Sequence, residues 1–125
     1  MKKLIAVAAV AFGMALSNGA LAHGAQAKHG GVVSSAGDLA FELVAKDGKA
    51  VIYVDDHGQQ LSTREAKGTL TVLDGAKKTE TALVPGEPNL LTSKADVILS
   101  KGTKAVASIA LAGRAPINVR FAVKK

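Results

Sequence analysis

The chain has 125 residues, a formal net charge of +6, no cysteine and only 3% aromatic residues. The lack of cysteine excludes disulfides, thiolate metal sites and thiol redox chemistry, so the fold must rest on its core alone. Nucleic-acid binding needs stacking platforms and a basic stripe, and the few aromatic residues and scattered lysines argue against it. We interpret the positive charge as ordinary solvation, with weak attraction to anionic surfaces.

Residues 1–22 are predicted to be a cleavable secretory signal peptide. Lys2 and Lys3 precede an uncharged apolar run over 4–16, and residues 20–22 (ALA) supply the small residues that signal peptidase requires. The apolar run is too short to span a bilayer. Cleavage after Ala22 makes His23 the first mature residue, whereas cleavage at a second small-residue site, after Ala27, removes it. We therefore expect a periplasmic or secreted protein with no stable membrane span after cleavage.

The remaining chain is predicted to form a mobile arm over 23–30 and a single β domain over 31–125. Over 39–45 Leu39, Phe41, Leu43 and Ala45 alternate with Ala40, Glu42 and Val44, as in a strand with one better-buried face, and a second β-prone run, 51–54, follows the pair Asp47-Gly48. This pattern indicates a hairpin, because a type I′ turn needs positive φ at both central residues.

The hairpin pattern recurs further along the chain. Asp74-Gly75 separates the runs 69–73 and 79–84, Lys101-Gly102 separates 97–99 and 105–111, and a last alternating run covers 117–123. Short strands joined by tight turns predict an all-β fold, a small antiparallel β-sandwich or barrel of about seven or eight strands.

The longest connection in this scheme covers 55–67, and loops of that length are often functional or mobile. Within it, residues 62–65 fit a capping box, which predicts either a single helical turn or a strand-to-strand loop. Glu42 and Glu80 alternate with apolar neighbours, so both are expected to face solvent.

The three histidines, His23, His29 and His57, are the candidate metal ligands. Imidazole suits Cu(II), Zn(II) and Ni(II), and a mature His23 also offers its α-amine, which forms a chelate with the ring. Asp55 and Asp56 precede His57 and are candidates to complete the ligand shell or to orient the imidazole. The alternative is that 55–58 (DDHG) is only a turn, in which Gly58 takes positive φ.

No catalytic constellation is predicted, so we expect that the protein is not an enzyme. The serines lack the context of a nucleophile elbow, and a triad of Ser62, His57 and an aspartate would have no oxyanion hole. Gly30-Gly31 lacks the strand–loop–helix context of a phosphate site.

Several segments together resemble a small β domain of exported bacterial heavy-metal efflux systems, found in periplasmic adaptor subunits of cobalt-zinc-cadmium-type pumps and in small exported proteins. They are 28–33 (KHGGVV), 41–44 (FELV), 53–58 (YVDDHG), 66–69 (AKGT), 83–90 (LVPGEPNL) and 120–121 (RF). The resemblance implies a periplasmic domain that handles metal or contacts a pump component, with His29 and His57 at its His-Gly positions. The chain lacks the hairpin and lipoyl regions of a complete adaptor, which implies an accessory protein.

Two functions are therefore in competition. The first is a periplasmic accessory protein that binds or buffers a transition metal in metal resistance or efflux, with an efflux-system protein as partner. The second is a protein-interaction module of the cell envelope without metal, which uses an edge strand or the 55–67 loop.

Overall fold

The computed structural model describes residues 26–124, so the predicted signal peptide and His23 lie outside the described residues. Within 26–124 there is no helix, and therefore none long and apolar enough to cross a membrane. The strands are β2 (Val32–Ala36), β3 (Leu39–Lys46), β4 (Lys49–Asp56), β5 (Gln59–Gln60), β6 (Lys67–Asp74), β7 (Lys77–Gly86), β8 (Leu90–Ser93), β9 (Lys104–Ala110) and β10 (Ile117–Ala122).

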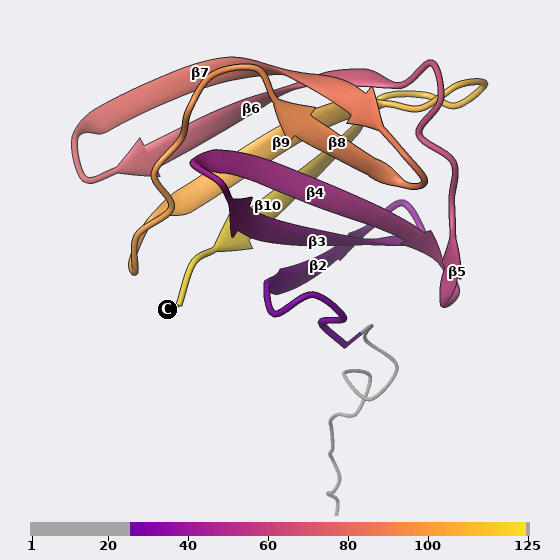
Figure 1. Cartoon of the computed structure of the whole chain (residues 1–125), viewed down its shortest axis with the longest axis horizontal. Helices are drawn as coiled ribbons and strands as arrows, with labels where there is room; N and C mark the ends of the chain where they lie inside the picture. The colour runs from indigo at the N-terminus through magenta and orange to yellow at the C-terminus, as the bar shows by residue number, and fades with distance from the viewer. Residues whose placement is uncertain (1–25, 125) are drawn as a thin grey trace, which may run out of the picture.

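These strands form one antiparallel sheet in the order β10-β9-β6-β7-β8-β4-β3-β2, with β5 paired to β4. The sheet curls until its two outermost strands, β2 and β10, lie beside each other, which gives a nearly closed barrel (Figure 1). The predicted all-β antiparallel fold is confirmed, in a barrel-like form. Because β2 and β10 shield each other, little of either sheet edge is open to another chain.

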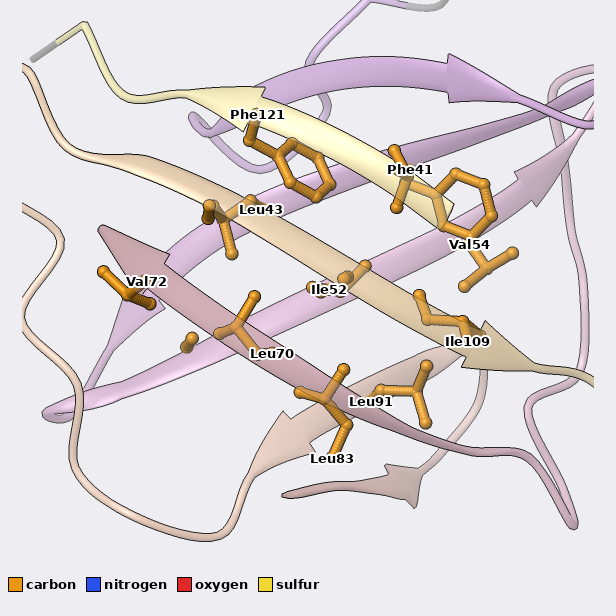
Figure 2. Packing of buried hydrophobic residues seen from close by; sticks show 14 of the residues in the cluster. Phe41, Leu43, Ile52, Val54, Leu70, Val72, Leu83, Leu91, Ile109 and Phe121 are labelled. Atoms are coloured by element: carbon orange, nitrogen blue, oxygen red, sulfur yellow. The ribbon is translucent and has the colours of Figure 1, made fainter. Parts of the chain in front are cut away.

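The barrel interior is filled by the inward side chains of the alternating strands. Phe41, Ile52, Leu70, Leu91 and Ile109 come from five different strands and are each fully buried (Figure 2). Burying one such side chain contributes about 1.5–3 kcal/mol, so this core can stabilise a domain that has no disulfide.

The turns agree with the sequence predictions only in part. Asp47 and Gly48 have φ of 53° and 81°, and Lys46 pairs with Lys49, so the predicted β3–β4 hairpin is confirmed. In the β6–β7 hairpin Asp74 is the last residue of its strand and pairs with Lys77, so the turn is Gly75-Ala76, one residue later than predicted.

The prediction of a strand over 97–99 is wrong. Val97 donates its backbone N–H to the Gly48 carbonyl at 2.8 Å, which fastens the segment to the β3–β4 turn and not to β9. Strands β2, β5 and β8 were not predicted, because they are short and carry polar residues such as Ser34, Gln59 and Thr92 at strand positions.

The 55–67 connection crosses one end of the barrel from β4 to β6, which are separated in the sheet by β7 and β8. It is well fastened. The buried Thr63 hydroxyl lies 2.8 Å from the Leu90 carbonyl oxygen and 3.0 Å from that of Gly86, and Leu61 donates its N–H to Val54. Residues 62–65 make a turn and no helix, which agrees with the strand-to-strand alternative.

Candidate functional site

The start of the described chain packs on the outer face of the barrel through one buried carboxylate, Glu42. Three backbone N–H groups donate to it, those of Lys28 at 2.9 Å and of His29 and Gly31 at 2.8 Å each. His29 Nδ1 lies 3.1 Å from the same carboxylate. We call residues 28–31 with Glu42 the arm clasp.

The expectation that Glu42 faces solvent is wrong, although its strand position is the outward one. Its neighbours Phe41 and Leu43 point into the core, so alternation places Glu42 on the outer face, where the arm then covers it and leaves it 6% exposed. Local periodicity cannot predict this burial, because the covering residues come from another segment. Glu80 is exposed, as expected.

Two contacts fix the arm at a close distance to the sheet. The His29 ring stacks on Tyr53, with centroids 3.6 Å apart and planes 4° from parallel. Tyr53 is the cross-strand partner of Glu42, so both contacts of the His29 ring are made by one cross-strand pair of the sheet. At Gly31 a Cβ would lie 2.2 Å from the Leu43 carbonyl oxygen, so only glycine allows this approach.

Lys28 connects the arm to the turn that carries His57. Its ammonium group lies 2.8 Å from Asp55 Oδ2 and donates to the Gly58 carbonyl at 3.2 Å. Asp55 also accepts from the Asn89 side-chain amide at 3.2 Å. Asp55, one of the predicted metal ligands, is therefore engaged in fixing the arm and the neighbouring loop.

His57 occupies the tip between β4 and β5. His57 and Gly58 have φ of 53° and 86°, so the predicted turn with Gly58 at positive φ is confirmed. The His57 side chain is 80% exposed, and its Nδ1 lies 2.6 Å from Asp56 Oδ1. Because an ionised carboxylate can only accept, this contact requires a hydrogen on Nδ1, so in the neutral ring Nε2 is the nitrogen that carries the lone pair. Arg114 lies 3.9 Å from the other oxygen of Asp56.

A surface cleft of about 590 Å³ lies between the arm and this turn, lined among others by Gln26, Asp38, Asp55 and His57. Within residues 26–124 no three His, Cys, Asp or Glu side chains form a group that could hold a metal ion. The fold thus brings Asp55, Asp56 and His57 to one rim and places His29 at the arm clasp, without building a complete ligand shell from them.

Electrostatics at the arm clasp favour the ionised carboxylate. Burial alone would raise the pKa of Glu42, but the N–H groups of Gly31 and Lys28, the His29 side chain and the His29 N–H outweigh it. The net result is a pKa below the ordinary value of 4.5. At neutral pH, Glu42 is therefore a buried anion that binds the arm.

Comparison of the chain with protein-family models, with curated protein sequences and with solved structures finds no match. The resemblance to heavy-metal efflux modules therefore stays a prediction. Glu42 and Tyr53, the residues that anchor the arm, are not predicted from the sequence. In the sequence, only the glycine pair Gly30-Gly31 beside His29 indicates that the backbone of this segment approaches another strand closely.

Proposed function

We propose that the protein is an exported, periplasmic accessory protein that binds a transition-metal ion, Cu(II), Zn(II) or Ni(II), in metal resistance or efflux. The observation that supports the proposal is the exposed His57 imidazole, whose Nδ1 is bonded to Asp56 at 2.6 Å. A carboxylate behind a histidine fixes the ring and raises the basicity of the other nitrogen, which is the usual outer shell of a metal-binding histidine.

In this proposal the further ligands come from the segment before Gln26. Gln26 and Ala27 line the same cleft as His57, and Lys28 is bonded to Gly58 beside it. Three residues of chain link His23 to Gln26, a reach of about 11 Å at most. After cleavage behind Ala22, His23 would bring an amine and an imidazole nitrogen to this rim, a set that suits Cu(II) and Ni(II).

The roles of the other candidate ligands differ. Asp56 orients His57, Asp55 holds Lys28, and His29 is held by Glu42 and Tyr53, which leaves its Nε2 as a further candidate ligand. For the competing hypothesis of a metal-free interaction module, β2 and β10 lie side by side, which leaves little of either edge strand open to a partner.

The test is calorimetric titration of residues 23–125 with Cu(II), Zn(II) and Ni(II). We expect one ion to bind more tightly than about 10 μM, equivalent to roughly 7 kcal/mol, and His57→Ala or His23→Ala to weaken binding about tenfold or more. His29→Phe tests whether His29 is a further ligand, because phenylalanine can keep the stacking on Tyr53 but has no ring nitrogens. Absence of binding, or binding by the His57→Ala and His23→Ala proteins that is as tight as in the wild type, would contradict the proposal.

The intact mass of the exported protein supplies the second test. A mature chain that begins at His23 supports the chelate, whereas one that begins at Lys28 removes His23 and excludes this form of the site.

A further inference from the structure

Lysines that are scattered along the sequence gather at one end of the barrel. That end, opposite to the His57 turn, is made by the β3–β4 and β6–β7 turns, by residues 95–103 and by the end of β10 (Figure 1). It carries seven lysines and three aspartates: Lys46, Lys49, Lys77, Lys78, Lys101, Lys104 and Lys124, with Asp47, Asp74 and Asp96. We call it the lysine end.

The lysine end also exposes apolar side chains. Ile98 is 81% exposed, while its neighbour Val97 is buried and Leu99 packs against the core, so the backbone holds Ile98 outward. Leu73, 38% exposed, is the cross-strand partner of both Lys78 and Lys104. Of the three large apolar residues exposed within 26–124, two therefore lie at this end, Leu73 between two lysines and Ile98 on a cleft that it shares with Lys77, Asp74 and Asp96.

We propose that the lysine end binds the surface of an anionic phospholipid membrane, with Ile98 inserted between headgroups and the lysines around it. A net positive cluster is attracted to anionic lipid, and an aliphatic side chain among lysines can enter the boundary between headgroups and acyl chains. This orientation leaves the His57 end directed away from the membrane.

The chemistry of this end favours lipid over an acidic protein. All its cations are lysines, whose flexible stems suit mobile headgroups, whereas the cores of protein interfaces are enriched in arginine and aromatic residues and depleted in lysine. The aromatic side chain nearest to this end, Phe121, is 4% exposed and belongs to the core.

The test is co-sedimentation of residues 23–125, which include the whole described barrel, with vesicles in metal-free buffer. The vesicles are phosphatidylcholine alone or with about one third phosphatidylglycerol. We expect binding only to the anionic vesicles, and an approximately tenfold or greater loss in about 0.5 M NaCl. Lys77→Glu with Lys78→Glu should cause a similar loss, whereas the charge-matched control Arg64→Glu with Lys67→Glu, at the opposite end, should retain binding.

Ile98→Asp tests the apolar part of the proposal, with Val84→Asp as control because Val84 is 40% exposed on β7, away from the lysine end. We expect a severalfold loss only for Ile98→Asp, with unchanged circular dichroism in both variants. Equal binding to neutral vesicles, equal loss in test and control variants, or binding to polyglutamate but not to vesicles would overturn the proposal. None of these outcomes depends on whether the protein binds a metal.

Discussion

The two ends of the barrel carry the same kind of turn with different residues in it. Asp47-Gly48 at the lysine end has φ of 53° and 81°, and His57-Gly58 at the other end has φ of 53° and 86°. Asp47 shows that the first position of such a turn needs no imidazole. Histidine is, like aspartate, enriched at positive φ, so the turn accommodates either residue, and the proposed metal-binding role rests on the exposed ring of His57 and its contact with Asp56.

The two ends also differ in how their charged groups are held. At the lysine end the carboxylates are exposed, and Lys49 pairs with Asp96 at 2.6 Å in solvent. At the other end Asp55 and Asp56 contact Lys28, Asn89 and His57, and Glu42 binds the arm on the outer face between the two ends. One end thus carries mostly exposed charges, and the other holds a few groups at defined distances.

The largest effect is expected from the core that both ends share. Phe41→Ala removes a fully buried ring and should lower the free energy of unfolding by about 3–5 kcal/mol. Chemical denaturation followed by circular dichroism measures the loss. Because the core is common to both ends, hydrogen exchange should increase at the arm clasp and at the lysine end together; an increase confined to one end would contradict a single cooperative barrel.

Glu42→Gln, one residue further along the same strand, should loosen the arm clasp without unfolding the barrel. The substitution replaces the carboxylate with a neutral amide. Because the carboxylate accepts from three backbone N–H groups and contacts the His29 ring, we expect the free energy of unfolding to fall by about 2 kcal/mol. The cost is limited because the arm can leave the sheet and be solvated. We expect faster exchange of the amides of Lys28, His29 and Gly31, with unchanged exchange near Ile98. Glu80→Gln, at an exposed strand position, is the control.

The third-largest effect is expected from acid, which should act differently on Glu42 and on the lysine end. The unfolded Glu42 titrates near 4.5 and the folded group below it, so its contribution to stability is complete above about pH 4.5 and is lost as the pH falls through the folded pKa. Side-chain hydrogen bonding and attraction to Lys49 also lower the pKa of Asp96, but this group is fully exposed and salt should cancel its effect. Denaturation between pH 3 and 7 should therefore show an acid loss that persists in about 0.5 M NaCl and disappears in Glu42→Gln.

The smallest expected effect concerns the His57 turn. His57→Asn converts the pair to Asn-Gly, the preferred sequence for a turn with two positive φ values, and should raise the free energy of unfolding by about 0.5 kcal/mol. Thermal unfolding measures the change, and titration with Cu(II) should show weaker binding in the same variant. A destabilised variant would mean that the imidazole contact with Asp56 supports the turn itself.

The sequence predicted those parts of the fold that depend on neighbouring residues. Alternation in 39–45 and 117–123 identified β3 and β10, and Asp47-Gly48 identified its hairpin, because strand faces and tight turns are set by a few adjacent residues. The prediction of a strand over 97–99 was wrong because its apolar residues pack against the core and bond to Gly48 without pairing to β9.

The candidate site was predicted less completely, for a related reason. Glycine at 58 and histidine at 57 indicated the turn, but not that Lys28 reaches it across 30 positions of sequence. In the same way, Glu42 looked solvent-facing because the residues that bury it approach from the arm.

The residue order by itself thus determined an all-β chain with defined hairpins, and it supplied the export pattern and the three histidines. Only the tertiary structure decided that the sheet closes, that the arm covers Glu42, and that the lysines gather at one end. The physical reason is that hairpin tips far apart in the chain become neighbours when an antiparallel sheet curls into a barrel. Side chains that look evenly scattered in one dimension are then concentrated on one surface.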